Sequence, residues 1–297
     1  MEITEKAPAK LNLYLDTPFQ HSNGDFEWEM VMTTVDLADY IHIETLPDYD
    51  QIIVQTDSGF LPCDHRNLTY QAAKKIKKHF SINVGLKISI QKNIPVAAGM
   101  GGGSADAAAV LRALNKLWKL GLSSQKLANF GLSLDSDVPF CVYSEPALVT
   151  GKGEIITPLN ELPAMWFIIA KPPASVSTPF ILKQVDHQKL HHQNIEQLVS
   201  GIKNQDFKQI TANMSNVLEP ITAKRYPEIS KIKNKMLQFG TSAALMSGTG
   251  PTVYGVCEKY SRASRVYNSL RGFCEEVYLV KPVSLKDKKD TLKNDLV

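Results

Sequence analysis

Cysteine is scarce in this sequence, and its spacing argues against a zinc site. The 297 residues include four cysteines, at positions Cys63, Cys141, Cys257 and Cys274. No two of them have the Cys-x2-Cys spacing of common zinc sites. Reduced thiols are therefore expected, as in cytoplasmic proteins.

An excess of one charge and long apolar runs are also missing. The net charge is +3, and the basic residues form no stripe interleaved with aromatic residues, so nucleic acid is not an expected partner. No apolar stretch approaches the roughly 20 residues that span a bilayer, and the acidic N-terminal residues do not resemble a secretory signal. We expect a globular cytoplasmic protein without a nucleic-acid or membrane partner, present as a monomer or homodimer.

Two familiar phosphate-binding signatures are absent as well, although the sequence contains a glycine loop. Four of the 17 glycines lie within five residues, at Gly99 and at positions 101–103. No lysine follows them, as a Walker A loop would need, and Ser104 stands where the dinucleotide fingerprint needs its third glycine. An alternating segment at 84–91 precedes the loop and an apolar run at 105–117 follows it, which predicts a strand, a loop and a buried helix.

Such a junction favours an anion site. Glycines adopt positive φ and let a ligand approach the backbone, while the start of a helix offers unpaired N–H groups and the positive end of its dipole. A phosphate is the usual ligand. A tight turn without a ligand is the alternative, but clustered glycines destabilise a chain unless a close approach requires them.

Three other segments carry candidate functional residues. In the alternating segment 7–15, Lys10 and Asn12 share one strand face, which by pattern alone favours a solvated surface. Asp137 stands directly before an apolar Val-Pro-Phe segment, where a turn or capping role is the alternative to catalysis. Residues 247–250, Ser-Gly-Thr-Gly, lie between two expected strands and would by themselves indicate a hairpin.

Taken in order, these segments resemble the motifs of the galactokinase, homoserine kinase, mevalonate kinase and phosphomevalonate kinase (GHMP) superfamily. The glycine loop resembles its Pro-x3-Gly-Leu-Gly-Gly-Gly-Ser motif, with Met100 in place of leucine. Pro-Ala-Lys-x-Asn at the N-terminus and Asp-Val-Pro-Phe at 137–140 are similar to one branch, the 4-diphosphocytidyl-2-C-methyl-D-erythritol kinases. The resemblance covers nearly the whole chain.

The resemblance implies an α+β GHMP kinase fold. Its N-terminal domain, of the ribosomal-protein-S5-domain-2-like type, would span residues 1–160, and a ferredoxin-like α/β sandwich domain would span 161–283, with the ATP site between them. The tail, 284–297, is expected to be disordered. Within the first domain, the strands at 41–45 and 52–55 are expected to pair as a hairpin.

The same resemblance implies the reaction and its residues. The γ-phosphoryl group of ATP, bound with Mg²⁺, would pass to the 2-hydroxyl group of 4-diphosphocytidyl-2-C-methyl-D-erythritol, in the methylerythritol route to isoprenoid and terpenoid precursors. Lys10 and Asp137 would be catalytic, with Asp137 as the base, and Ser104 is a candidate for contact with the metal. The expected ATP-binding residues are Asn67, for which a helix cap is the alternative, and Pro95, Val96, Ala97, Ala98, Gly99, Met100, Gly101, Gly102, Gly103, Ser104 and Ala105. The expected substrate-binding residues are Asn12, Asp25, Phe26, Thr178, Ser247, Gly248, Thr249 and Gly250.

Two departures from the family pattern leave alternatives open. Asp25 and Phe26 stand where the branch has a Tyr-His pair that holds the cytosine ring, which indicates either a drifted turn or an altered specificity. Asp135 replaces a glycine and adds a negative charge beside the expected base. A kinase of this scaffold for another alcohol is therefore one alternative. A nucleotide-binding protein with little catalysis is another, although a pure binder would not need Lys10 and Asp137.

Overall fold

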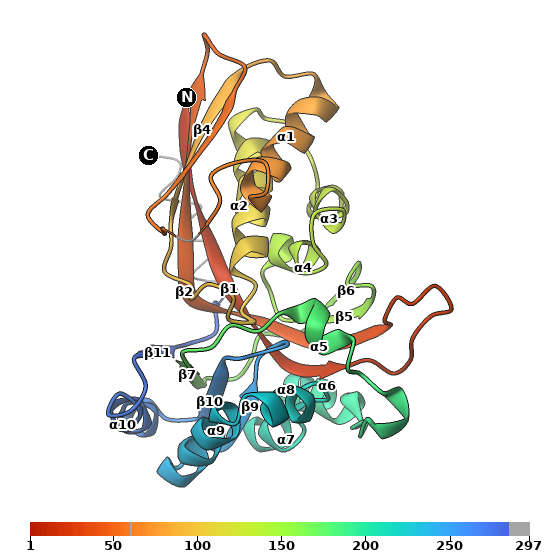
Figure 1. The fold of residues 1–297 in the computed structure, drawn as a ribbon, viewed down its shortest axis with the longest axis vertical. Helices are drawn as coiled ribbons and strands as arrows, with labels where there is room; N and C mark the ends of the chain where they lie inside the picture. Colours follow the sequence, from red (N-terminus) through yellow and green to blue (C-terminus); the bar gives the residue numbers. More distant parts are fainter. Residues whose placement is uncertain (60, 285–297) are drawn as a thin grey trace. The chain divides into compact units, whose positions relative to one another are not determined.

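The computed structural model describes residues 1–59 and 61–284, so the expected disordered tail lies, from residue 285 on, outside the described residues (Figure 1). The chain forms two compact units. The first contains Met1–Lys10, Leu37–Val96 and Gly101–Ser144; the second contains Leu11–Asp36, Ala97–Met100 and the chain from residue 145 on. The long strands β1 (Glu2–Asp16) and β2 (Trp28–Leu46) each contribute residues to both units. The boundary expected near residue 160 stays a prediction.

In the first unit, the strands follow the order β3-β4-β2-β1. β4 (Gly85–Gln91) pairs with β2 in the antiparallel sense and with β3 (Ile52–Thr56) in the parallel sense. The hairpin expected between 41–45 and 52–55 is therefore wrong, because β4 lies between these strands. Ile88 of β4 stands opposite Ile43 on one side and Val54 on the other and is fully buried, so central burial of β4 decided the order.

The helices of the first unit gather on one face of these strands (Figure 1). The glycine loop leads into α2, whose apolar residues Ala107, Val110 and Leu114 are fully buried, as the sequence predicted. Because many of its buried side chains are alanines, the neighbouring helices α1 and α4 pack close to it. The helices are α1 (Leu68–Phe80), α2 (Gly102–Leu117), α3 (Ser124–Leu132) and α4 (Val138–Tyr143).

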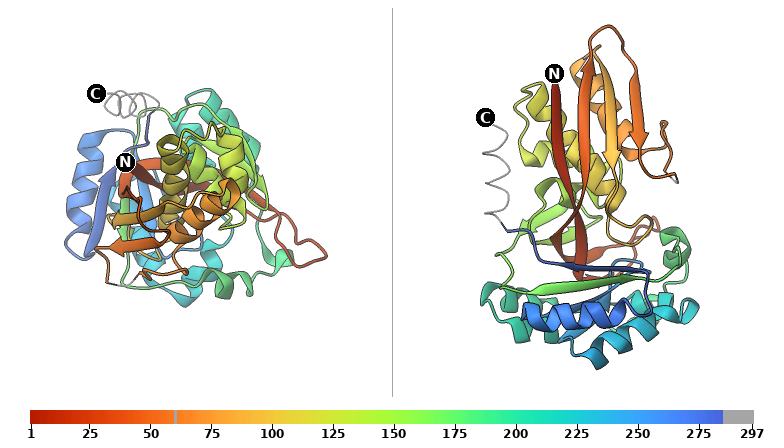
Figure 2. Two further views of the ribbon diagram at one scale, coloured as in Figure 1. Left: turned by 90° about the horizontal axis from the view of Figure 1, so that it is seen from above. Right: turned by 90° about the vertical axis from the view of Figure 1, so that its left-hand side faces the viewer.

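The second unit contains an antiparallel sheet with the order β11-β7-β10-β9. α9 (Glu228–Phe239) precedes β9, α10 (Tyr260–Leu270) connects β10 to β11, and the two helices pack together (Figure 2). This order of strands and helices confirms the predicted ferredoxin-like arrangement. The strands are β7 (Trp166–Lys171), β9 (Ala243–Met246), β10 (Val253–Cys257) and β11 (Glu276–Val280).

Shorter elements complete the second unit. The hairpin of β5 (Ala147–Gly151) and β6 (Ile155–Pro158) pairs with the start of β2, and β8 (Ser215–Asn216) pairs with the end of β1. The remaining helices are α5 (Thr178–Leu182), the 3-10 helix η1 (His187–Lys189), α6 (Ile195–Lys203), α7 (Phe207–Ala212) and α8 (Glu219–Arg225).

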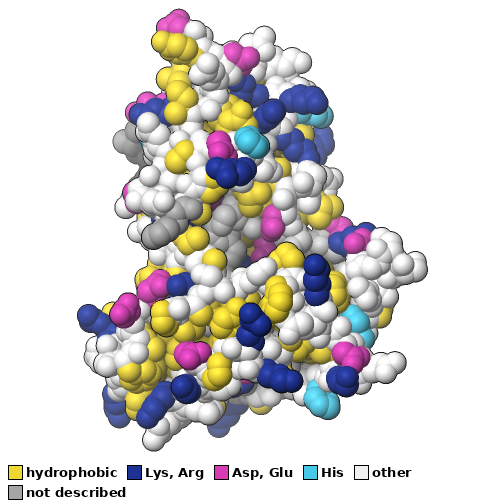
Figure 3. All heavy atoms as spheres, in the orientation of Figure 1, with side chains coloured by type: hydrophobic (Ala, Val, Ile, Leu, Met, Phe, Trp, Pro, Cys, Tyr) yellow, Lys and Arg dark blue, Asp and Glu magenta, His cyan; other side chains and the backbone are white. Residues whose placement is uncertain are grey.

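The surface agrees with the modest net charge. On the face drawn in Figure 3, lysine and arginine side chains are interspersed with acidic ones. Over the described parts of the chain, none of the helices is both long enough and apolar enough to cross a membrane.

Candidate active site

The first unit brings together the two residues expected to be catalytic. Nζ of Lys10, on β1, lies 3.3 Å from Oδ2 of Asp137, the residue that precedes α4. The Lys10 side chain is 5% exposed and that of Asp137 is 24% exposed. A solvated strand face at Lys10 is therefore excluded, because both faces of β1 are buried here. Solvent can therefore reach the Asp137 carboxylate, whereas the Lys10 side chain is almost fully buried.

Gly101 of the glycine loop provides the space for this pair. Its φ is +66°, and a Cβ at this position would lie 2.9 Å from Cγ of Lys10 and 3.7 Å from Oδ2 of Asp137. A side chain at position 101 would thus be strained in its backbone and pressed against the lysine stem. The loop and the expected catalytic pair therefore form one packed arrangement.

The same glycine is the N-cap of α2. Without a side chain it cannot cap the helix, and the first turn of α2 contains no acidic residue. The N–H groups at the start of α2 lack partners within the helix, and the helix dipole adds positive potential there. The start of α2 thus has the chemistry of a phosphate site.

Ser104, in the first turn of α2, is tied to Asp135 of the loop that carries Asp137. The Ser104 hydroxyl donates to Oδ1 of Asp135 at 2.8 Å, and the same oxygen accepts the N–H of Asp137 at 3.0 Å. Sequence reasoning considered Asp135 only as an added charge. The structure shows that it also connects the glycine loop to the expected base.

A buried cluster that sequence reasoning missed supports the chain just before the loop. Lys92 forms ion pairs with Asp39 and with Asp106, the latter at 2.7 Å, and all three side chains are at least nine-tenths buried. Oδ1 of Asp39 also accepts the N–H groups of Asn93 and Ile94, at 2.6 and 2.8 Å. An acidic residue at 106, inside an otherwise apolar run, was the sequence feature that could have indicated the cluster.

Burial governs the electrostatics of this cluster. It raises the pKa of Asp106 to about 8, with the charge of Asp39 adding to the effect and that of Lys92 opposing it. For Lys92 burial acts in the other direction, but the carboxylates of Asp106 and Asp39 outweigh it and raise its pKa. Nζ of Lys92 lies 3.4 Å from the position a Cβ would take on Gly102, so the cluster contacts the first residue of α2.

In the second unit, the Ser-Gly-Thr-Gly loop contacts the remaining part of the glycine loop. The Ser247 hydroxyl donates to the carbonyl oxygen of Gly99 at 3.0 Å. Gly99 has a φ of +70°, and a Cβ there would lie 2.4 Å from the Ser247 carbonyl oxygen. The side-chain amide of Asn216 stabilises the loop by donating to the carbonyl groups of Met246 and Gly248, both at 2.8 Å.

Two further substrate candidates, one of them the threonine of this loop, lie close together. The hydroxyl groups of Thr178 and Thr249 are 2.8 Å apart. Asn12, by contrast, is fully buried, and its amide donates to Sδ of Met30 at 3.5 Å. The structure therefore places Asn12 within the packing of the second unit, and its contact with substrate stays a prediction.

The two departures at positions 25 and 26 have partners in the second unit. Asp25 forms an ion pair with Lys152, in the turn after β5, which holds the pKa of the Asp25 carboxyl below its usual value. The Phe26 ring lies 5.6 Å from the ring of Trp28 and 5.6 Å from that of His187. The negative charge of Asp25 is thus offset locally, and Phe26 belongs to an aromatic group.

Asn67 caps the start of α1, which was the alternative to a nucleotide contact at this residue. Its Oδ1 accepts the N–H of Thr69 at 2.9 Å, as an N-cap of α1, and its Nδ2 donates to the Pro62 carbonyl oxygen at 2.8 Å. Contact with a nucleotide stays a prediction for this residue. Among the loop candidates, Pro95, Ala98 and Met100 are buried, whereas Val96 and Ala97 are exposed.

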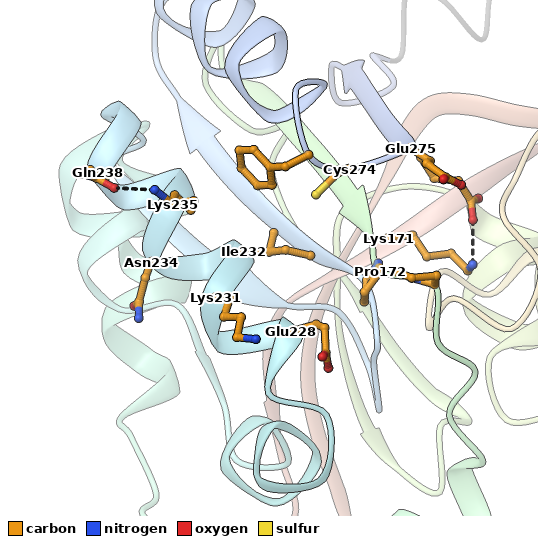
Figure 4. Close-up of a pocket in the computed structure, with 13 residues that line it drawn as sticks. Lys171, Pro172, Glu228, Lys231, Ile232, Asn234, Lys235, Gln238, Cys274 and Glu275 are labelled. Atoms are coloured by element: carbon orange, nitrogen blue, oxygen red, sulfur yellow. Dashed lines mark hydrogen bonds and ion pairs between the residues drawn. The ribbon is translucent and has the colours of Figure 1, made fainter.

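A cavity of about 590 Å³ lies elsewhere in the second unit, between α9 and the ends of β7 and β11 (Figure 4). Ile232 and Pro172 give it apolar walls, while the ammonium group of Lys171 is paired with Glu276 at 2.7 Å. None of the residues predicted to form the active site lines this cavity.

Family models match both halves of the chain. The model of the GHMP kinases N terminal domain matches residues 67–145, and that of the GHMP kinases C terminal domain matches residues 198–276. Together with the glycine loop and the Lys10–Asp137 pair, these matches define a GHMP-type kinase.

Individual relatives narrow the class. The 4-diphosphocytidyl-2-C-methyl-D-erythritol kinase of Ligilactobacillus salivarius is 63% identical over 281 residues, covering 95% of this chain and 97% of the relative. The enzyme of the same name from Lactiplantibacillus plantarum is 62% identical over 288 residues, covering 97% of this chain and all of the relative. The chain belongs to the 4-diphosphocytidyl-2-C-methyl-D-erythritol kinase family.

Solved structures of related kinases have the same fold as this chain. A crystal structure of 4-(cytidine 5'-diphospho)-2C-methyl-D-erythritol kinase matches with a TM-score of 0.81 at 27% identity, covering 95% of this chain and 100% of that one. A homoserine kinase from Cytophaga hutchinsonii matches with a TM-score of 0.76 at 20% identity, covering 94% of each chain, and shares the fold.

Proposed function

We propose that this chain transfers the γ-phosphoryl group of ATP to the 2-hydroxyl group of 4-diphosphocytidyl-2-C-methyl-D-erythritol. Family membership supports the substrate, and the observation that carries the chemistry is the Lys10–Asp137 pair packed against Gly101 at the start of α2. A cytoplasmic location and a monomeric or homodimeric state stay predictions.

In this mechanism Asp137 is the general base. Its partly exposed carboxylate accepts the proton of the substrate hydroxyl as the new oxygen–phosphorus bond forms and the bond between the β- and γ-phosphates breaks, which releases ADP. The ammonium group of Lys10 favours the charged form of Asp137 and stabilises negative charge that develops on the attacking oxygen. The N–H groups at the start of α2 hold the phosphates.

The oxygen donors near the loop suit Mg²⁺ delivered with ATP. Magnesium prefers oxygen ligands and is commonly held by one or two carboxylates together with substrate phosphates. The Ser104 hydroxyl and the Asp137 carboxylate provide such oxygens, and over the described residues no group of three or more His, Cys, Asp or Glu side chains could hold a metal ion without the nucleotide. When bound, the ion neutralises phosphate charge.

The test is ADP release from MgATP with and without the proposed substrate. Asp137→Asn should lower the substrate-dependent rate by about 10²- to 10⁴-fold, because the amide cannot accept the proton. Asp48→Asn makes the same chemical change at an exposed turn and serves as the control. Release that ignores the substrate, or survives in Asp137→Asn, would contradict the proposal.

A different alcohol is a second candidate acceptor, because Asp25 and Phe26 replace the Tyr-His pair that holds the cytosine ring in the resembled branch. Cytidine monophosphate separates the two, because a cytidine site should bind it and lower the rate competitively against the proposed substrate. If the compound neither binds nor inhibits, a different alcohol is favoured.

A further inference from the structure

One carboxylate oxygen in the first unit contacts two parts of the proposed machinery. Oδ1 of Asp135 accepts the hydroxyl of Ser104, on α2, at 2.8 Å and the backbone N–H of Asp137 at 3.0 Å. Ser104 is buried, whereas the Asp135 side chain is exposed. The Asp135 oxygen therefore connects the first turn of α2 to the backbone of the expected base.

The direction of the first hydrogen bond has a chemical consequence. A serine hydroxyl has one proton and two lone pairs, and a carboxylate can only accept. The Ser104 proton is therefore committed to Asp135, which leaves the lone pairs of the serine oxygen for other partners. A hydroxyl held in this way is suited to contact a cation and unsuited to donate to a phosphate oxygen.

The second hydrogen bond acts on the base. Asp137 occupies the position before α4, and a fixed N–H at this residue restricts the backbone that carries its carboxylate. A glycine, which the family motif has at position 135, offers no side chain for either bond. Asp135 thus supplies two restraints that its side chain alone makes possible.

We propose that Asp135 is a positioning residue that orients the Ser104 hydroxyl toward the metal ion of a bound nucleotide and holds the backbone of Asp137. The proposal rests on the proposed function for its nucleotide site. Asp135 positions both groups through the two hydrogen bonds that its Oδ1 accepts, and it does not itself bind the metal.

The conservative variant separates geometry from charge. Asp135→Asn keeps an oxygen that can accept both hydrogen bonds but removes the negative charge, whereas Asp135→Ala removes both. Ser136→Ala, in the same exposed loop, is the matched control. Affinity for Mn²⁺–ADP, measured by water proton relaxation, and affinity for metal-free ADP, measured by calorimetry, are the two readouts, and neither requires the alcohol substrate.

Asp135→Ala should weaken binding of Mn²⁺–ADP by about 10-fold, as expected for the loss of one hydrogen bond that orients the Ser104 hydroxyl, while metal-free ADP binds as in the wild type. Asp135→Asn should stay within about twofold of the wild type for both ligands, since an amide oxygen accepts the same bonds. The double variant Ser104→Ala/Asp135→Ala should bind Mn²⁺–ADP as strongly as Ser104→Ala alone, because Asp135 acts on the metal through Ser104.

Three outcomes in the variants would overturn the proposal: Mn²⁺–ADP binding by Asp135→Asn as weak as that by Asp135→Ala, additive losses with Ser104→Ala, or no loss in Asp135→Ala. If Asp135→Ala does not fold, as judged by thermal unfolding, Asp135→Gly replaces it with the residue of the family motif. If the Mn²⁺–ADP affinities of the variants are as expected but the protein phosphorylates a different alcohol, the proposed function is wrong and this inference is still supported. A wild-type protein that binds no Mn²⁺–ADP would overturn the inference itself.

Discussion

Two groups of lysine and aspartate flank the start of α2 in the first unit, and they differ in access to solvent. Lys10 pairs with a single carboxylate, Asp137, which is 24% exposed. Lys92 pairs with two carboxylates, Asp39 and Asp106, which are 0% and 4% exposed. An accessible carboxylate can exchange a proton with a substrate, whereas a sealed cluster can only hold its neighbours in place. We therefore expect the first group to serve the proposed chemistry and the second to hold the structure.

The largest expected effect comes from replacing each lysine by methionine. Lys92→Met leaves the buried side chains of Asp39 and Asp106 without their partner and should cost about 3–5 kcal/mol of unfolding free energy. Lys10→Met leaves a carboxylate that water can reach, so it should cost much less stability while lowering the rate of ADP release. Denaturant unfolding and the ADP assay on both variants measure the difference. Equal losses of stability would abolish the distinction between the two groups.

The next effect is a pH dependence that belongs to the sealed cluster. Because burial raises the pKa of Asp106 from 3.8 to about 8, the folded state binds this proton more tightly than the unfolded chain. The resulting stabilisation is full below about pH 3.8 and is lost as the pH rises through 8. Unfolding free energies of the wild type should therefore fall, relative to those of Asp106→Asn, between these pH values. A difference that is constant with pH would show that Asp106 does not hold its proton in the folded state.

The smallest expected effect isolates the contact between Gly101 and the Lys10–Asp137 pair. Gly101 and Gly121 have φ values of +66° and +65°, but a Cβ on Gly121 would have no atom within 4 Å. Alanine at either position should cost about 1–2 kcal/mol of unfolding free energy through backbone strain. Gly101→Ala should in addition lower the rate of ADP release, because its methyl group presses on Lys10. Equal rates in the two variants would mean that the position of Lys10 tolerates this shift.

Much of the fold followed from local pattern. Alternation at 84–91, four glycines and an alanine-rich run predicted β4, the loop and α2 because each depends on residues close together in the chain. The ferredoxin-like arrangement of the second unit, which the family resemblance implied, was also confirmed. The hairpin at 41–45 and 52–55 was wrong because the pairing of β3 depends on β4, about 30 residues further on.

By itself, then, the sequence determined the glycine loop, the resemblance that singled out Lys10 and Asp137, and the two departures at positions 25–26 and 135. Only the tertiary structure decided that Lys92 meets Asp39 and Asp106, that Ser247 contacts Gly99 across 148 positions of sequence, and that Asp135 bridges Ser104 and Asp137. The physical reason is that periodicity and turn chemistry act over a few residues. Burial, charge pairing and hydrogen-bond geometry are fixed by which distant segments pack together.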